Sequence, residues 1–172
     1  LDETVIFVKK ELEKLKQLKL EYDSKVKIAV DIDDTILSTK ELEEHYWNIF
    51  LNNHPEIDKT KEYRWGDSEL TLFWQEHRED MAFGKVKDGV SEAFEEMKKK
   101  DYIVDLLSAR PLNKYASLNK KLSEYFEENN LIYSHMHLGF YSKTDFLVDH
   151  KYDVLIDNEL RHIESANEKG ID

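Results

Sequence analysis

The chain has 172 residues, 40% of them hydrophobic and 12% aromatic, which is enough to form one folded domain and argues against disorder. Its net charge of −12 argues against broad binding of polymeric nucleic acid or anionic lipid, and the absence of cysteine excludes disulfides, thiolate catalysis and zinc–thiolate sites. No apolar run approaches the roughly 18 residues of a membrane span, and there is no signal-peptide pattern, so we expect a cytoplasmic protein that does not contact membranes.

Residues 1–25 are highly charged and favour a helix. Val5, Val8, Leu12, Leu15 and Tyr22 fall near one face of this predicted helix. We expect that face to pack on the domain that follows. The alternative is a helical linker or the seam of a homodimer, although a coiled coil usually needs more heptads.

Residues 26–31, VKIAVD, form a short β-branched run suited to a strand that is buried on both faces. Ser38 and Glu41 have the spacing of a capping box and predict a helix through about Asn52. A second amphipathic helix is predicted over residues 68–81.

After Gly84 the chain alternates between helical and strand patterns. Such alternation predicts right-handed βαβ crossovers, and hence an α/β fold with a Rossmann-like parallel sheet and helices on both faces. The helical stretch 39–83 does not fit the alternation and is predicted to be a small cap inserted into a core of residues 26–38 and 84–172. The later elements are predicted at 89–100 (helix), 102–108 (strand), 111–128 (helix), 133–140 (strand), 153–157 (strand) and 159–169 (helix).

Reactive side chains follow three of the predicted strands, at the end of the sheet where open α/β folds bind ligands. Each residue alone has an ordinary structural explanation, such as capping a helix or facing solvent, but their shared position does not. They are Asp31, Asp33, Asp34 and Thr35 after the first strand, Ser108, Ala109 and Arg110 at the second, and Asp157, Asn158 and Glu159 at the last, with Lys143 in the loop before it.

Two acids from different strand ends, Asp31 and Asp157, can converge on one hard cation. Oxygen ligands without histidine or cysteine suit Mg²⁺, and magnesium held by few protein ligands usually accompanies a phosphate substrate. A carboxylate can also attack phosphorus and form an aspartyl phosphate. The pattern therefore indicates phosphoryl-transfer chemistry.

The motifs resemble those of the haloacid dehalogenase-like (HAD) phosphohydrolases. VDIDDTIL is similar to the D-x-D-x-T signature, VDLLSARP to the second motif, Lys143 in FYSKTDFL to the third-motif lysine, and DVLIDN to the acidic fourth motif. The match runs in the family's order over roughly residues 26 to 170. The insertion at 39–83 is in the position of a C1-type cap and resembles that of 5'(3')-deoxyribonucleotidases and related nucleotidases. Exported class B acid phosphatases are a second relative.

The resemblance implies a role for each motif residue. Asp31 is the nucleophile and a metal ligand. Asp33 protonates the leaving group, then activates water, and turns its backbone carbonyl to the metal. The remaining roles are phosphoryl binding by Ser108 with Ala109 and Arg110, charge balance by Lys143, magnesium binding by Asp157, and bracing of the loop by Thr35.

Two positions depart from the family pattern. The fourth motif reads Asp157–Asn158–Glu159 where a second acid is common, so Asn158, Glu159 and Asp153 remain alternatives for assisting the metal. Asp34 replaces a frequent glycine. We expect its backbone N–H to matter more than its carboxylate, so Asp34→Gly should be tolerated.

The cap contains all three tryptophans, and Trp47 and Trp74 are candidates for stacking on a nucleobase. The alternative is that these rings form the core of the cap, which is the commoner use of aromatic residues at helical spacing. His77, Arg78 and Arg110 are candidates for binding substrate phosphate or sugar.

The sequence thus predicts a Mg²⁺-dependent phosphomonoesterase that acts on a small phosphate ester, with a nucleoside monophosphate as the leading substrate. A broad acid phosphatase-like hydrolase is one alternative. The others are a phospho-aspartate signalling domain, which would keep a lasting adduct, and a non-catalytic interaction module.

Overall fold

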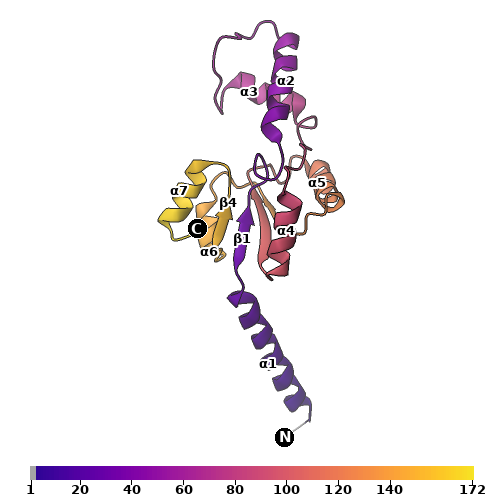
Figure 1. The fold of residues 1–172 in the computed structure, drawn as a ribbon, viewed down its shortest axis with the longest axis vertical. Coiled ribbons are helices and arrows are strands. Elements are labelled where there is room, and N and C mark those ends of the chain that lie inside the picture. Colours follow the sequence, from indigo (N-terminus) through magenta and orange to yellow (C-terminus); the bar gives the residue numbers. More distant parts are fainter. Residues whose placement is uncertain (1–2) are drawn as a thin grey trace.

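The computed structural model describes residues 3–172 and has a four-stranded parallel sheet at its centre (Figure 1). The strands are β1 (Lys27–Val30), β2 (Ile103–Ser108), β3 (Met136–Leu138) and β4 (Val154–Ile156), in the order β3-β2-β1-β4. Because every pairing is parallel, all four carboxyl ends meet at one edge of the sheet. The predicted α/β class is confirmed.

Helices cover both faces of the sheet, as predicted. Ile28 and Val30 pack with α4 (Val90–Lys99) and α5 (Ala116–Glu128), whereas Ala29 between them packs with α6 (Thr144–Asp149) and α7 (Leu160–Glu168). Successive strand residues point to opposite faces, so both sets of contacts need apolar side chains. This requirement explains the continuous apolar run of the first strand.

Several predicted elements differ from the structure in their bounds, and one short helix was not predicted. The helix α5 begins at Ala116 rather than Pro111, and the strand predicted over 133–140 is limited to Met136–Leu138. Lys143 lies at the N-cap position of α6, a six-residue helix, where the sequence suggested only a loop. A single helical turn or two is too short to give a readable 3.6-residue period.

The insertion after β1 forms a cap that lies beyond the carboxyl ends of the strands (Figure 1). Its helices are α2 (Thr39–Asn53) and α3 (Ser68–His77), the latter ending four residues before the predicted Met81. The cap has an apolar cluster of its own around Phe50 and Phe73, separate from the clusters on the two faces of the sheet.

The two segments that connect the cap to the core run side by side. The Ser38 backbone N–H donates to the Lys85 carbonyl oxygen at 2.8 Å, and Leu37 forms an antiparallel bridge with Val86. A Cβ atom on Gly84 would lie 2.8 Å from the Ser38 carbonyl oxygen, so this approach requires glycine.

The capping box predicted at Ser38 does not form, because the Ser38 side chain makes no capping hydrogen bond. The Asp34 carboxylate takes this role instead and accepts a 2.8 Å hydrogen bond from the Lys40 backbone N–H. Asp34 is held in the left-handed region, with φ of 61°, and this turn brings its carboxylate to the first turn of α2.

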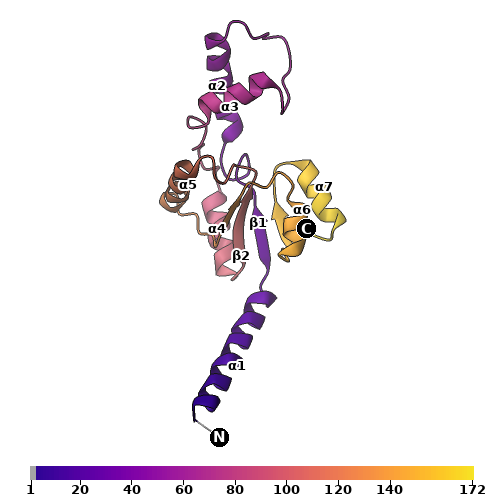
Figure 2. The same ribbon diagram turned by 180° about the vertical axis from the view of Figure 1, so that it is seen from behind.

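The helix α1 (Glu3–Ser24) projects away from the core on the side opposite the cap, as both views show (Figures 1 and 2). Its apolar residues are exposed, including Leu12 at 54% and Leu15 at 61%. The expectation that this helix packs on the domain is therefore wrong. Leu1 and Asp2, which open the predicted helix, lie outside the described residues.

Among residues 3–172, no helix combines the length and apolar character needed to cross a membrane.

Candidate active site

The carboxyl edge of the sheet gathers the charged side chains that the sequence places at strand ends. Asp31 directly follows β1, and Asp157 directly follows β4. The Lys143 Nζ lies 2.8 Å from Asp31 Oδ1 and 2.6 Å from Asp157 Oδ2. All three side chains are nearly excluded from solvent, so one lysine lies between two buried carboxylates.

The environment of Asp31 disfavours its charged form. Burial raises the pKa of Asp31 to about 6, and the nearby Asp157 carboxylate adds to this effect, whereas Lys143 opposes it. The positive charge of Lys143 alone therefore does not offset the cost of holding both carboxylates in their charged form.

Asn158 extends the cluster around Asp31. One terminal atom of its side-chain amide lies 3.0 Å from both Asp31 Oδ2 and the Asp33 carbonyl oxygen. If this atom is nitrogen, it donates to both oxygens. If it is oxygen, three acceptor oxygens face one another and the single proton of the Thr35 hydroxyl can serve just one of them, an arrangement that a cation would stabilise. The Thr35 Oγ1 lies 3.3 Å from the same amide atom and from Asp31 Oδ2, and so braces the turn.

This donor set fits magnesium. In the described part of the chain, no three acidic or histidine side chains cluster as metal ligands. Magnesium does not need such a cage, since it usually binds one or two carboxylates and keeps waters or substrate phosphate as its other ligands. Asp31, Asp157 and the oxygens of Asp33 and Asn158 are the groups that would hold it.

The Asp33 side chain is 35% exposed and is bound by a guanidinium. Arg110 donates from Nε to Asp33 Oδ2 at 3.0 Å and from Nη2 to Oδ1 at 2.8 Å, and the Thr39 hydroxyl donates to Oδ1 at 2.7 Å. Burial by itself would raise the pKa of Asp33, but Arg110 and Thr39 hold it below its usual value. In this arrangement Asp33 is an ionised carboxylate.

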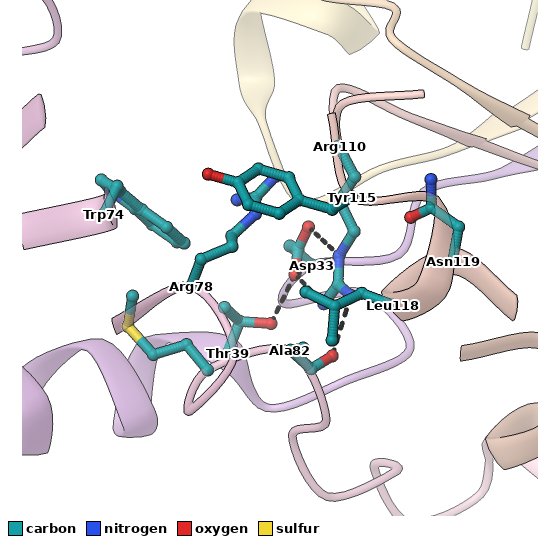
Figure 3. A pocket seen from close by; sticks show the side chains of 10 residues that line it. Asp33, Thr39, Trp74, Arg78, Ala82, Arg110, Tyr115, Leu118 and Asn119 are labelled. Carbon is teal, nitrogen blue, oxygen red and sulfur yellow. Dashed lines mark hydrogen bonds and ion pairs between the residues drawn. The ribbon is translucent and has the colours of Figure 1, made fainter. Parts of the chain in front are cut away.

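A small cavity opens beside Asp33, between the cap and the core (Figure 3). Its volume of about 30 Å³ admits small polar groups but not a nucleobase unless the cap shifts. The cavity is lined by Asp33, Thr39, Trp74, Arg78, Met81, Ala82, Arg110, Tyr115, Leu118 and Asn119.

Ser108 is also placed at this edge. It ends β2, is buried, and its hydroxyl oxygen accepts a 3.1 Å hydrogen bond from the Arg110 backbone N–H. Ala109, between them, is half-buried. The second predicted motif therefore reaches the same edge as Asp31 and Asp33.

Other candidates lie away from the cavity. Trp47 is part of the cap core, with its ring centroid 5.3 Å from Phe50 and 5.1 Å from Phe73, and it does not line the cavity. His77 is buried in the same cluster of rings and pairs with Asp80 at 2.9 Å. Of the two candidate tryptophans, only Trp74 reaches the cavity.

The three residues considered as further metal-site groups, Asn158, Glu159 and Asp153, lie in different places in the structure. Asp153 Oδ2 accepts the backbone N–H of Lys27 at the amino ends of the strands, at the other edge of the sheet. Glu159 pairs with Arg161 at 2.6 Å. Of the three, Asn158 is the residue that contacts Asp31. In the sequence, its position directly after Asp157 was the feature that pointed to this contact.

Six residues that line the cavity were missed by the sequence analysis: Thr39, Met81, Ala82, Tyr115, Leu118 and Asn119. Thr39 looked like the start of a cap helix, and the hydrogen bond of its hydroxyl to Asp33 depends on the turn at Asp34. Tyr115 lies in an irregular segment before α5, and no sequence pattern connects it to the cap.

Neither the family models nor the curated proteins contain a match to this chain. Solved structures do. A haloacid dehalogenase-like hydrolase from Streptococcus pneumoniae matches with a TM-score of 0.60 and 13% identity, over 86% of this chain and 82% of that one. A protein from Haemophilus somnus described as a predicted phosphoglycolate phosphatase matches with a TM-score of 0.59 and 14% identity, over 87% of this chain and 83% of that one.

A protein from Bacillus subtilis described as a HAD hydrolase, in a structure with bound magnesium, matches with a TM-score of 0.58 and 13% identity, over 86% of this chain and 85% of that one. At such low sequence identity these matches show a similarity of fold. This chain has the fold of the haloacid dehalogenase-like hydrolases.

Proposed function

We propose that the protein is a magnesium-dependent phosphomonoesterase that works through an aspartyl phosphate on Asp31. The observation that carries this proposal is the contact of Lys143 with both Asp31 and Asp157 at the carboxyl edge of a parallel sheet. The fold shared with HAD hydrolases supports it. Magnesium, when bound, would supply positive charge to Asp31 and to the phosphoryl oxygens.

The reaction has two steps. An Asp31 carboxylate oxygen attacks phosphorus, the ester P–O bond breaks, and the leaving alkoxide takes a proton from Asp33. Water then attacks the aspartyl phosphate, Asp33 accepts a proton from that water, and inorganic phosphate and free Asp31 are released. Lys143 and the Ser108 hydroxyl hold the phosphoryl oxygens.

The ion pair with Arg110 sets a condition on the first step. It favours the ionised form of Asp33, which is the base required by the second step. Asp33 must gain a proton before it acts as an acid. Separation of Arg110 from Asp33 on substrate binding would allow Asp33 to gain that proton, because burial alone raises its pKa.

The substrate we propose is a small phosphate ester, with nucleoside monophosphates as the leading class. Trp74 on the cavity wall is the support for a nucleobase, because an indole face stacks on any base. A base would take the place of Arg78, whose Cζ lies 5.2 Å from the centroid of this ring, and the cap would have to shift to admit it. Thr35 and Ala109 would act on the phosphoryl side, through the braced turn and the backbone at the end of β2.

The test is phosphate release from p-nitrophenyl phosphate and from a panel of nucleoside monophosphates and sugar phosphates, with and without Mg²⁺. Asp31→Asn should lose at least about 10³-fold in kcat/KM while remaining folded. Asp88→Asn, at an exposed acid on the core, is the matched control. An Asp31→Asn protein with wild-type activity would overturn the proposal, and a stable phospho-Asp31 adduct would favour a signalling domain.

We also propose that α1 pairs with α1 of a second copy. Val5, Val8, Leu12 and Leu15 have the 3–4 spacing of a coiled-coil seam, and all are exposed in the single chain. With that spacing, Glu11 and Lys16 occupy g and e positions, which form opposite-charge pairs between parallel helices.

Light scattering after size-exclusion chromatography tests this pairing. The wild-type chain should be dimeric, and Leu12→Lys should be monomeric because it places a charge in the seam. Gln17→Lys adds the same charge on the outer face and should stay dimeric. A monomeric wild type at tens of micromolar would contradict the pairing.

A further inference from the structure

The cavity beside Asp33 contains a guanidinium that forms no ion pair with any described acid, although the Asp33 carboxylate lies close enough to interact with it electrostatically. Arg78, at the end of α3, is half-buried, with its Cζ 5.2 Å from the ring centroid of Trp74 and 5.2 Å from that of Tyr115 (Figure 3). Within residues 3–172, its guanidinium makes neither an ion pair nor a hydrogen bond. Rings hold this side chain in place, while its five N–H donors have no protein acceptor.

The other arginine in the cavity is fully engaged. Arg110 uses Nε and Nη2 on Asp33 and donates from Nη1 to the Ala82 carbonyl oxygen at 2.8 Å. Asp33 is thereby paired, and among the described residues it is the only acid that lines the cavity, against two arginines. A local excess of positive charge is notable in a chain whose net charge is −12.

The position of Arg78 indicates which part of a substrate it would meet. The phosphoryl group belongs at Asp31, Lys143 and Ser108, whereas the leaving oxygen must reach Asp33 to take its proton. Arg78 lines the same cavity as Asp33, so it lies on the side of the leaving group rather than of the phosphoryl group.

We propose that Arg78 forms a second anion subsite, and that the preferred substrates are phosphate esters whose alcohol part carries a carboxylate or a second phosphate. The inference rests on the proposed phosphatase function and narrows its substrate class. A guanidinium is suited to this task because it binds carboxylate and phosphate oxygens in pairs and keeps its charge when partly desolvated.

A purely structural role for Arg78 predicts something different. Trp74 belongs to the cap and Tyr115 to the core, so the side chain between them also holds the two parts together. Loss of such a latch would weaken the turnover of every substrate to a similar degree. Loss of an anion subsite would weaken only the preference for doubly anionic substrates.

The experiment compares kcat/KM within matched substrate pairs in the full chain with Mg²⁺. Glycerol 3-phosphate and 3-phosphoglycerate differ by a carboxylate in place of a CH₂OH group. Adenosine 5'-monophosphate and adenosine 3',5'-bisphosphate differ by a second phosphate. The ratio within each pair reports the second anion and separates its two possible sources.

In the wild type we expect at least one ratio to favour the doubly anionic substrate by about 10- to 100-fold, and Arg78→Met to remove most of that preference. Arg78→Lys should retain part of the preference, because lysine keeps the positive charge but lacks the paired N–H donors of a guanidinium. Arg64→Met, an exposed arginine of the cap, should leave the ratios unchanged.

The outcomes separate this inference from the function it rests on. If the wild type turns over both members of a pair with kcat/KM ratios near one, or if Arg78→Met does not change those ratios, the proposed subsite is wrong. Either result would leave the proposed phosphatase activity unaffected. An absence of turnover on both members of both pairs and on p-nitrophenyl phosphate would overturn the phosphatase itself.

Discussion

The guanidinium of Arg110 binds both carboxylate oxygens of Asp33, with Nε 3.0 Å from Oδ2 and Nη2 2.8 Å from Oδ1. Burial would raise the pKa of Asp33, yet this pairing and the Thr39 hydroxyl hold it below its usual value. The residue proposed as acid and base therefore has its charge set by a neighbour from the end of β2.

Replacing Arg110 tests that control directly. Arg110→Met removes the nearest opposing charge but leaves Asp33 half-buried, so the titration midpoint of the Asp33 carboxyl should rise. Carbon-detected NMR of labelled aspartate carboxyls measures it. The same substitution at exposed Arg161 should leave this midpoint in place. An unchanged midpoint in Arg110→Met would contradict the assignment.

Lys143 should contribute strongly to stability. Lys143→Met leaves the buried carboxylates of Asp31 and Asp157 facing each other, and we expect it to cost about 3–5 kcal/mol in metal-free buffer. Adding Asp157→Asn removes the repulsion, so the double variant should recover part of that loss. Urea unfolding measures both. Lys85→Met, at a lysine 80% exposed, should stay within about 0.5 kcal/mol of the wild type.

If the double variant were no more stable than Lys143→Met alone, repulsion between the two acids would not be the cause of the loss. The cycle is informative because Lys143 contacts both acids directly.

Glu43, on α2, makes stability depend on pH. Burial, together with the charges of Asp34 and Asp33, raises the pKa of Glu43 from 4.5 to about 7. The folded state thus binds this proton more tightly than the unfolded state. The contribution is fully present below pH 4.5 and is lost as pH rises through about 7.

Glu43→Gln should therefore match the wild type at pH 4 and exceed it at pH 8 by about 1–2 kcal/mol, allowing for partial exposure. Thermal unfolding across this pH range measures the difference. Glu41→Gln, at an exposed position on the same helix, should show no such divergence. Parallel stability curves for Glu43→Gln and the wild type would refute the prediction.

Asp34 combines a strained backbone with a useful carboxylate. Asp34→Gly relieves the φ of 61° but loses the hydrogen bond to Lys40, so the two effects offset and stability should change by less than about 1 kcal/mol. Asp34→Ala loses the bond and keeps the strain, and should cost about 1–3 kcal/mol. Urea unfolding distinguishes them. Equal losses in both variants would show that the backbone strain is unimportant.

The sequence alone determined the layout of the core. The apolar run before Asp31, the hydroxyl after the second strand and the acid after the last are local patterns, and parallel pairing necessarily brings such strand ends to one edge. For this reason the α/β class and the meeting of Asp31 and Asp157 could be anticipated without coordinates, whereas the place of Lys143 beside them was expected from the resemblance of its motif.

Only the tertiary structure decided the rest. Asn158 and Glu159 are adjacent in sequence, yet the Asn158 amide lies 3.0 Å from Asp31 Oδ2 whereas Glu159 pairs with Arg161. Trp47 and Trp74 carry the same signal, yet one fills the cap core and the other lines the cavity. Periodicity shows which residues share a helix face but not what that face packs against. For the same reason the sequence did not show that α1 projects away from the core. The contact of Arg78 with Tyr115 and the hydrogen bond from Arg110 to the Ala82 carbonyl oxygen depend on how the cap sits over the core, which no local pattern encodes.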